Sequence, residues 1–129
     1  MKTSAISICP RFHHAVELIG RRWTGAIIKV LLEGRVRFNG ITAAIPEMSD
    51  RMLSERLREL EQKGIIERLV IPETPVRVEY ELTEKGRALE GAMCAVGQWA
   101  ETWIELPATS MTQTVEPATD SPATAAAGA

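Results

Sequence analysis

Residues 49–82 limit the possible folds more than any other part of the chain. Residues 50–63 form one helix-length segment, with Ser49 as an N-cap before it and Gly64 as a stop after it. Three leucines in this segment recur at helical spacing and fall within one narrow sector: Leu53, Leu57 and Leu60. The segment is therefore predicted to be an amphipathic helix that packs its leucines on a core.

A two-stranded hairpin is predicted directly after this helix. Residues 65–71 are apolar and β-branched, residues 72–75 include two prolines, and residues 76–82 alternate apolar and charged side chains. These three segments are typical of a strand, a turn and a half-buried strand.

The other elements favour a winged helix-turn-helix. The sequence predicts a helix from Pro10 to Gly20 capped by Cys9, a helix over 24–32, an extended piece over 36–38, a short helix from an Asn39 cap to Ala44, and one long helix from a Thr83 cap to about residue 105. Two short helices followed at once by a hairpin give the winged helix-turn-helix order, in an α+β fold that is mainly helical. A generic α+β domain is the alternative.

Composition divides the chain into three parts. Residues 107–129 contain seven Ala, five Thr and three Pro and lack Leu, Ile and aromatic residues, so they cannot bury enough apolar surface to offset their ordering entropy. We expect an N-terminal arm over 1–8, one folded domain over 9–106 and a disordered tail over 107–129.

Charge is unevenly distributed along the chain. The net charge of −2 does not indicate a nucleic-acid binder. Residues 1–37, however, carry seven basic and two acidic side chains, whereas residues 38–106 carry eight basic and thirteen acidic ones. A local basic face therefore remains compatible with this composition.

The side of the 50–63 helix that is opposite the leucines is polar. It carries Arg51, Ser54, Glu55, Arg58 and Gln62. Arginine reads guanine edges, glutamate accepts from cytosine, and serine serves bases or phosphates. A solvated charged face is the alternative for a helix taken alone. The adjoining hairpin favours DNA reading, because a wing accompanies a reader helix.

Other candidate DNA contacts lie outside this face. Arg77, on the polar face of the second hairpin strand, suits a minor groove or a phosphate, with pairing to Glu67 or Glu79 as the alternative. Thr24, at the start of the second helix, is placed to present its hydroxyl and backbone amides to a phosphate. The remaining candidates are Arg37 and Ser49.

Several segments share a pattern with one known family: residues 9–10 (CP), 20–24 (GRRWT), 37–39 (RFN), 52–61 (MLSERLRELE) with Gly64, and 75–86 (PVRVEYELTEKG). Together they resemble the HxlR-type winged helix-turn-helix transcriptional regulators of bacteria, relatives of the MarR group, over about residues 9–103. Trp99 matches a tryptophan of the family's last helix. The chain departs from the family at Arg21-Arg22, where Gly-Lys is common, and at Gly40-Ile41, where an acidic residue and leucine are common.

The resemblance implies a homodimer that binds a palindromic operator, with the first and last helices at the interface. Such a dimer represses or activates neighbouring genes, and repression is the expected outcome here. The sequence supports the dimer independently, because the last helix carries an apolar stripe that ends in Trp99 and Trp103. The alternative is that both tryptophans cover the core of their own subunit.

Cys9 has two interpretations. At a helix N-terminus, unpaired amides and the positive end of the helix dipole stabilise a thiolate. Some HxlR-type regulators use an N-terminal cysteine as a redox or electrophile sensor, which this position resembles. The alternative is a small residue packed at the dimer interface. Cys94 is expected to be an unreactive helix residue.

The sequence gives no reason to expect an enzyme, a metal or a cofactor. Cys9, His13 and Glu17 share one helix face, but no fourth zinc ligand is in view. No glycine-rich phosphate loop or nucleophile elbow is present. Without a signal sequence or an apolar run of about 20 residues, the cytoplasm, and there the nucleoid, is the expected location.

The expected partners are an operator duplex, a second copy of the chain and a small oxidant or electrophile. A winged-helix protein-interaction module without DNA binding is the alternative function, and the acidic pI of about 5.7 suits it. A sensor whose main task is thiol chemistry is a third.

Deletion of residues 107–129 is expected to leave stability and DNA binding nearly unchanged, because their composition predicts no packing against the domain. Thermal unfolding of the full and shortened chains at one protein concentration tests this. A loss of several degrees on truncation would refute it.

Overall fold

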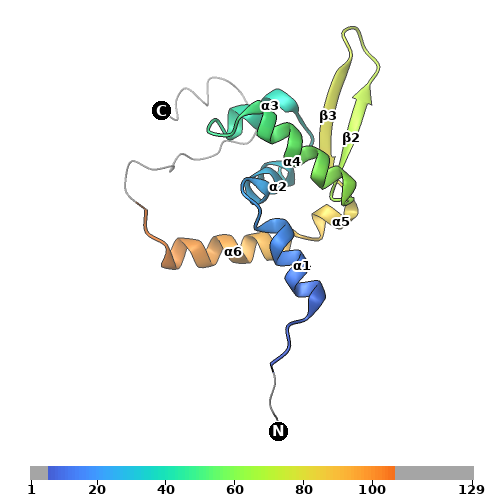
Figure 1. Cartoon of the computed structure of the whole chain (residues 1–129). Helices are drawn as coiled ribbons and strands as arrows, with labels where there is room; N and C mark the ends of the chain where they lie inside the picture. The colour runs from blue at the N-terminus through green and yellow to red at the C-terminus, as the bar shows by residue number, and fades with distance from the viewer. Residues whose placement is uncertain (1–5, 107–129) are drawn as a thin grey trace.

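A three-stranded antiparallel sheet and the helices beside it make up residues 6–106, the part of the chain that the computed structural model describes (Figure 1). The elements in order are α1 (Pro10–Ile19), α2 (Thr24–Leu32), β1 (Val36–Arg37), α3 (Phe38–Ala44), α4 (Asp50–Gln62), β2 (Ile66–Ile71), β3 (Arg77–Leu82), α5 (Glu84–Arg87) and α6 (Glu90–Trp103). The predicted α+β, mainly helical winged helix-turn-helix is confirmed.

The predicted tail over 107–129 and the first five residues of the predicted arm lie outside the described residues. Residues 6–8 have no regular secondary structure.

The core is centred on α2, which Figure 1 places between α4 on one side and α6 on the other. Its side chains Ile27, Ile28 and Leu31 are fully buried. The three leucines of α4 are also buried against this cluster, as their spacing predicts. The apolar stripe of α4 thus fixes which side of the helix is left for solvent.

Both ends of α4 are closed by local bonds that the sequence predicts. The Ser49 hydroxyl accepts a hydrogen bond from the Met52 amide at 3.0 Å. At the other end Gly64 adopts a left-handed φ of 76°, and the Ile65 amide donates to the Leu60 carbonyl at 2.9 Å. This is a Schellman ending, and it turns the chain directly from the helix into the wing.

The sheet has the order β1-β3-β2, and β2 and β3 extend away from the helices as the wing (Figure 1). Val36 pairs with Tyr80 and Arg37 with Glu79, so the expected extended piece is a strand of the sheet. The prediction that Asn39 caps the next helix is wrong: Arg37 is the N-cap, and α3 begins at Phe38. The strand pairing holds Arg37 extended, which leaves the following residue free to start the helix.

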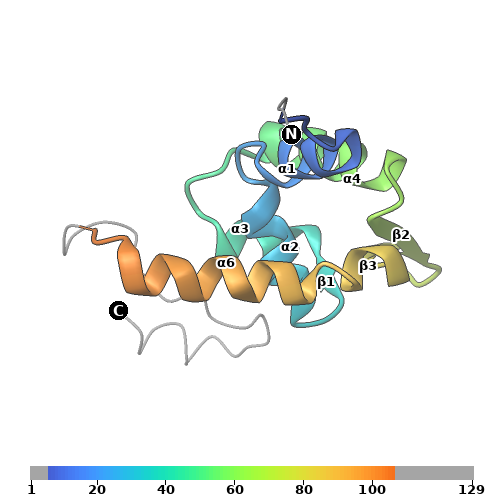
Figure 2. The same cartoon turned by 90° about the horizontal axis from the view of Figure 1, so that it is seen from below.

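The single long helix predicted after Thr83 is also wrong, because it is divided into α5 and α6. Thr83 caps α5 as predicted, its hydroxyl accepting from the Gly86 amide at 3.2 Å. The Leu89 amide then bonds to the carbonyl of Gly86 at 3.0 Å, three residues back instead of four, and Leu89 becomes the N-cap of α6. The tightened turn redirects α6, which runs along one side of the molecule (Figure 2).

Substitution of Gly86 by alanine is expected to destabilise the domain by about 1–3 kcal/mol. A Cβ at this position would overlap the backbone carbonyl oxygen of Ile65 and would lie 2.9 Å from Leu82 Cδ2. The backbone carbonyl belongs to the α4–β2 turn and cannot move aside cheaply. Chemical unfolding at fixed protein concentration measures the change.

The matched control is Gly91→Ala in α6, where an added Cβ meets nothing within 4 Å. This variant is expected to be more stable by about 0.5–1 kcal/mol, because alanine restricts the unfolded chain and favours helix. Equal stability of both variants would contradict the close packing of α5 on the turn.

Candidate nucleic-acid interface

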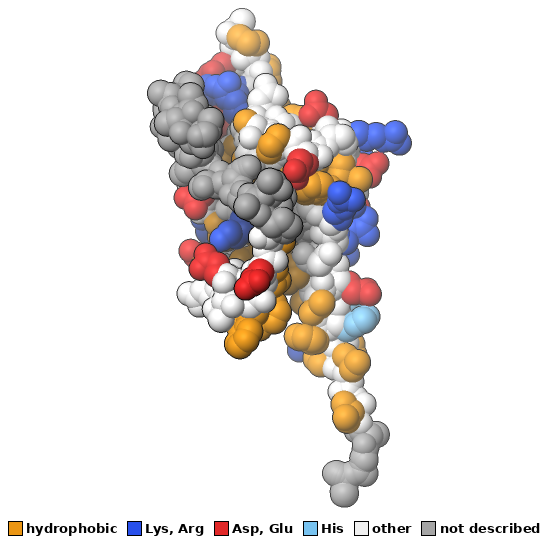
Figure 3. Space-filling model, turned by 90° about the vertical axis from the view of Figure 1, so that its left-hand side faces the viewer, with side chains coloured by type: hydrophobic (Ala, Val, Ile, Leu, Met, Phe, Trp, Pro, Cys, Tyr) orange, Lys and Arg blue, Asp and Glu red, His pale blue; other side chains and the backbone are white. Residues whose placement is uncertain are grey.

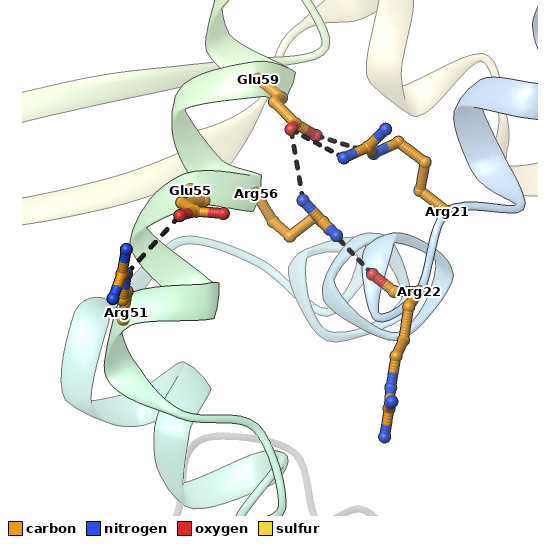
Figure 4. A network of polar contacts seen from close by, with 6 residues as sticks. All are labelled: Arg21, Arg22, Arg51, Glu55, Arg56 and Glu59. Carbon is orange, nitrogen blue, oxygen red and sulfur yellow. Dashed lines mark hydrogen bonds and ion pairs between the residues drawn. The ribbon is translucent and has the colours of Figure 1, made fainter.

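The outward side of α4 is an exposed polar surface, as predicted. Arg51, Ser54 and Arg58 are exposed, and Glu55 is partly exposed. The Arg51 side chain is 89% exposed and lies 3.7 Å from Glu55 across one helical turn. Figure 4 shows this pair on one side of α4. We call the surface formed by Arg51, Ser54, Glu55 and Arg58 the reader face.

Two further candidates lie near the ends of the helix-turn-helix. Ser49 is exposed, and its hydroxyl oxygen caps α4, which leaves the hydroxyl proton available to an acceptor. Arg37 is exposed at the start of α3, and its register opposite Glu79 places both residues on the same face of the sheet. The structure therefore keeps both side chains accessible.

Arg77 begins β3 near the tip of the wing and is held by acidic neighbours. Its guanidinium lies 3.2 Å from the Glu73 carboxylate and 2.9 Å from that of Glu79. The shorter distance joins Arg77 Nε and the Glu79 carboxylate, but its geometry is not that of a hydrogen bond. Within the described residues, the Nε–H of Arg77 has no hydrogen-bond acceptor. Of the two alternative partners, Glu79 is confirmed, whereas Glu67 pairs in register with Glu81. A phosphate would have to compete with these carboxylates for Arg77.

The predicted phosphate contact of Thr24 is wrong. The residue is only 1% exposed, because it is buried in the first turn of α2. Its backbone amide is also engaged, donating to the Arg21 carbonyl at 3.0 Å. Neither the hydroxyl nor the amide of Thr24 is open to a ligand.

Arg56 is the residue that sequence reasoning missed. It is the one charged side chain buried within residues 6–106, with 9% of its side chain exposed. Its Nε donates to the Arg22 carbonyl at 2.9 Å and its Nη1 to Glu59 at 3.2 Å, on the side of α4 away from Arg51 (Figure 4). The available signal was spacing: at 100° per residue, residue 56 lies about 40° from Leu60, beside the apolar stripe.

Apolar side chains are exposed on two helices at one end of the molecule. Trp99 and Trp103 of α6 are 58% and 69% exposed, so they do not cover the core of their own subunit. Phe12 and Val16 of α1 are exposed as well. Figure 3 shows hydrophobic side chains gathered in the lower part of one face. We call this surface, formed by these four residues, the apolar face.

Cys9 occupies the N-cap of α1 as predicted, without a hydrogen bond from its side chain to the helix. Both Cys9 and Cys94 are exposed. The His13 Nε2 lies 3.4 Å from the Glu17 carboxylate, and within residues 6–106 no group of three His, Cys, Asp or Glu side chains has the geometry of a metal site. No helix of the described region is long and apolar enough to cross a membrane.

The fold and the exposed reader face define a winged helix-turn-helix protein. Residues 18–107 match the family model of the HxlR-like helix-turn-helix, and the chain belongs to the HxlR family of transcriptional regulators. The resemblance seen in the sequence is thereby confirmed.

Characterised and uncharacterised relatives from Bacillus subtilis support the assignment. The chain is 51% identical to the uncharacterised regulator YvaP over 98 residues, 76% of this chain and 91% of YvaP. It is 50% identical to the regulator YodB over 99 residues, 77% of this chain and 88% of YodB. Both relatives are named as helix-turn-helix transcriptional regulators.

Solved structures of the same group superpose on the fold. The reduced form of YodB aligns with a TM-score of 0.70 at 50% identity, covering 77% of this chain and 97% of that structure. The redox regulator HypR in its oxidised form aligns with a TM-score of 0.71 at 37% identity, covering 76% and 100%. YodB has also been solved after diamide treatment and with quinone bound.

Proposed function

We propose that the chain acts as a homodimer that binds a palindromic operator in a sequence-specific manner and represses neighbouring genes in the cytoplasm. In this proposal α4 enters the major groove, and Arg51, Ser54, Glu55 and Arg58 read base edges. Ser49, Arg37 and Arg77 bind the sugar–phosphate backbone and fix the register.

One observation supports this function above the others: the reader face is exposed and polar while the opposite side of the same helix is locked into the core. A helix held in this way presents its side chains at fixed positions, which base readout requires. The wing extends from the end of the same helix, where it reaches the neighbouring backbone or minor groove.

The apolar face supports the homodimer. Large exposed apolar surfaces on soluble domains mark interaction sites, and tryptophan is enriched at their centres. A second copy of the chain presents the same surface, which suits a symmetric interface in which α1 and α6 of each subunit take part. The twofold symmetry then matches a palindrome, with half-sites about 34–36 Å apart.

Selection from a random duplex library tests sequence-specific binding directly. The proposal expects enrichment of one palindromic sequence with half-sites spaced by about one helical turn. Enrichment of no sequence, together with the capture of protein partners that bind through α4 or the wing, would favour the protein-interaction module.

We further propose that Cys9 makes the regulator responsive to oxidants or electrophiles. The support is its exposed position at the start of α1, next to the apolar face, and the quinone-bound and diamide-treated forms of the relative YodB. With a quinone, the Cys9 sulfur forms a bond to a ring carbon and the quinone is converted to a hydroquinone thioether. With diamide, Cys9 and the partner's Cys94 form a disulfide, and two electrons and two protons pass to the diamide.

The adduct is the first choice, because it needs only one reactive thiol. The disulfide also requires Cα atoms within about 7 Å across the interface. The alternative role of Cys9, packing at the interface, predicts no response to either reagent.

Quinone or diamide is expected to weaken operator binding by the wild-type protein, because the adduct enlarges the Cys9 side chain at the interface and the disulfide links it to the partner's Cys94. Substitution of Cys9 by serine is expected to abolish this loss of binding. Binding is measured by fluorescence anisotropy before and after treatment, with Cys94→Ser as the matched variant. Mass spectrometry identifies an adduct or a disulfide. Wild-type binding that persists under both reagents would leave Cys9 as a packing residue.

A further inference from the structure

Four polar residues join the reader helix to the connection that follows α1. Arg21 makes a bidentate pair with Glu59, its Nη2 donating to Oε2 at 3.1 Å and its Nε lying 3.1 Å from Oε1. Arg56 donates both to the same Glu59 carboxylate and to the Arg22 carbonyl. Figure 4 shows all four residues between α4 and the α1–α2 connection. We call them the α4 tether.

The helix α1 has little else to hold it on its own subunit. Every residue from 9 to 17 is exposed, and α1 has no buried residue. Only Leu18 and Ile19, in the last turn, pack against the core. The direction of α1 is therefore set by its last turn and by the connection to α2.

That connection is anchored to the core by Trp23. Trp23 has a left-handed φ of 74°, uncommon for a bulky residue, and packs against the core. The Arg22 guanidinium lies 4.9 Å from the centre of the Trp23 ring, at a cation–π distance. A displacement of α1 is thus passed to the tether instead of being absorbed by a loop.

Burial makes the contacts of the α4 tether hold α4 in one position. The Arg56 guanidinium is removed from water, so its bonds are not readily exchanged for bonds to solvent. Glu59 supplies the compensating charge and receives a second arginine from the connection. Hydrophobic contact alone would let α4 slide against its neighbour, whereas a bidentate pair and a carbonyl bond fix its position and rotation.

We propose that the α4 tether is a positioning element, which holds the reader helix at a fixed offset from the dimerisation helix α1 and so sets the half-site spacing that the dimer accepts. This inference rests on the proposed function. Within a dimer, the distance between the two reader faces depends on the interface and on the α1-to-α4 link in each subunit. Loosening the link leaves each reader face intact and makes the distance between them variable.

The test compares spacing discrimination between variants of the full chain. The probes are the duplex that the wild-type protein selects, versions with one base pair added or removed between the half-sites, and a single half-site. A one-base-pair change moves and rotates one half-site, so the wild-type dimer is expected to lose at least about tenfold in affinity. Glu59→Ala is expected to lose less than about threefold and to bind the half-site as the wild type does.

Lys85→Met is the matched control. Lys85 Nζ donates to the Lys63 carbonyl at 2.7 Å and ties the other end of α4 to α5, away from α1. Its removal is expected to retain the tenfold discrimination. Arg21→Met is a second tether variant. It removes only the exposed ion pair between Arg21 and Glu59, so a folding defect in Glu59→Ala does not prevent the test.

The proposed function and the tether proposal can be overturned separately. If the wild-type protein selects no duplex, the proposed function is wrong, and the spacing proposal falls with it. If it does select one and both tether variants discriminate spacing as the wild type does, only the tether proposal is overturned.

Discussion

Replacement of Trp99 and Trp103 together by alanine is expected to convert the proposed homodimer to monomers and to weaken operator binding about 100-fold or more. Both side chains are mostly exposed in the subunit, so their loss removes little from its own core. Truncation of a tryptophan to alanine at the centre of an interface commonly costs about 2 kcal/mol or more of association free energy. A monomer also loses the gain in affinity from binding two half-sites at once.

Sedimentation and operator titration at one protein concentration measure the two effects. Glu101→Ala is the control, because Glu101 is exposed on α6 and lies about 200° around the helix from Trp99. Circular dichroism shows whether the double variant remains folded, since subunits of an obligate dimer can lose stability on dissociation. A folded double variant that stays dimeric and binds the operator fully would remove the apolar face from the interface.

Replacement of Arg58 or Arg51 by alanine is expected to weaken operator binding by about 1–3 kcal/mol, or roughly 5- to 150-fold, if the residue reads a base. Stability should barely change, because neither side chain faces the core. The Arg51 side chain makes only an exposed ion pair with Glu55, which contributes little to folding.

Arg87→Ala is the matched control for this second prediction. Arg87 is an exposed arginine on α5, outside both the reader face and the wing. Its loss changes the net charge by the same amount without removing a candidate contact. If Arg51→Ala and Arg58→Ala both bind as Arg87→Ala does, α4 is not the reader helix.

Local signals predicted the reader helix well. The spacing of Leu53, Leu57 and Leu60, the Ser49 cap and the Gly64 stop all act within a few residues of one another, so they are visible in the sequence. The same holds for the wing, whose turn and alternation are local. Because the leucine spacing predicts which side of α4 faces the core, it also predicts which side is left for polar residues.

Features that depend on residues distant in the sequence were not predictable in this way. Thr24 is buried at the start of α2, and no pattern near Thr24 shows that. The helix divides just after Gly86, which lies close to the Ile65 carbonyl, 21 positions earlier. Arg56 was assigned no role because its partner carbonyl lies 34 positions away.

The salt dependence of operator binding shows directly whether the chain binds DNA through its phosphates. A DNA-binding dimer releases counterions from each phosphate that it neutralises. In the proposed dimer, Arg37 and Arg77 of the two subunits are expected to make about four such contacts. The logarithm of the association constant should therefore fall linearly with the logarithm of salt concentration, with a slope of about −3 or steeper. The selected palindrome should remain preferred over a scrambled duplex across the range. A slope near zero, or equal affinity for the scrambled duplex, would contradict sequence-specific DNA binding by this chain.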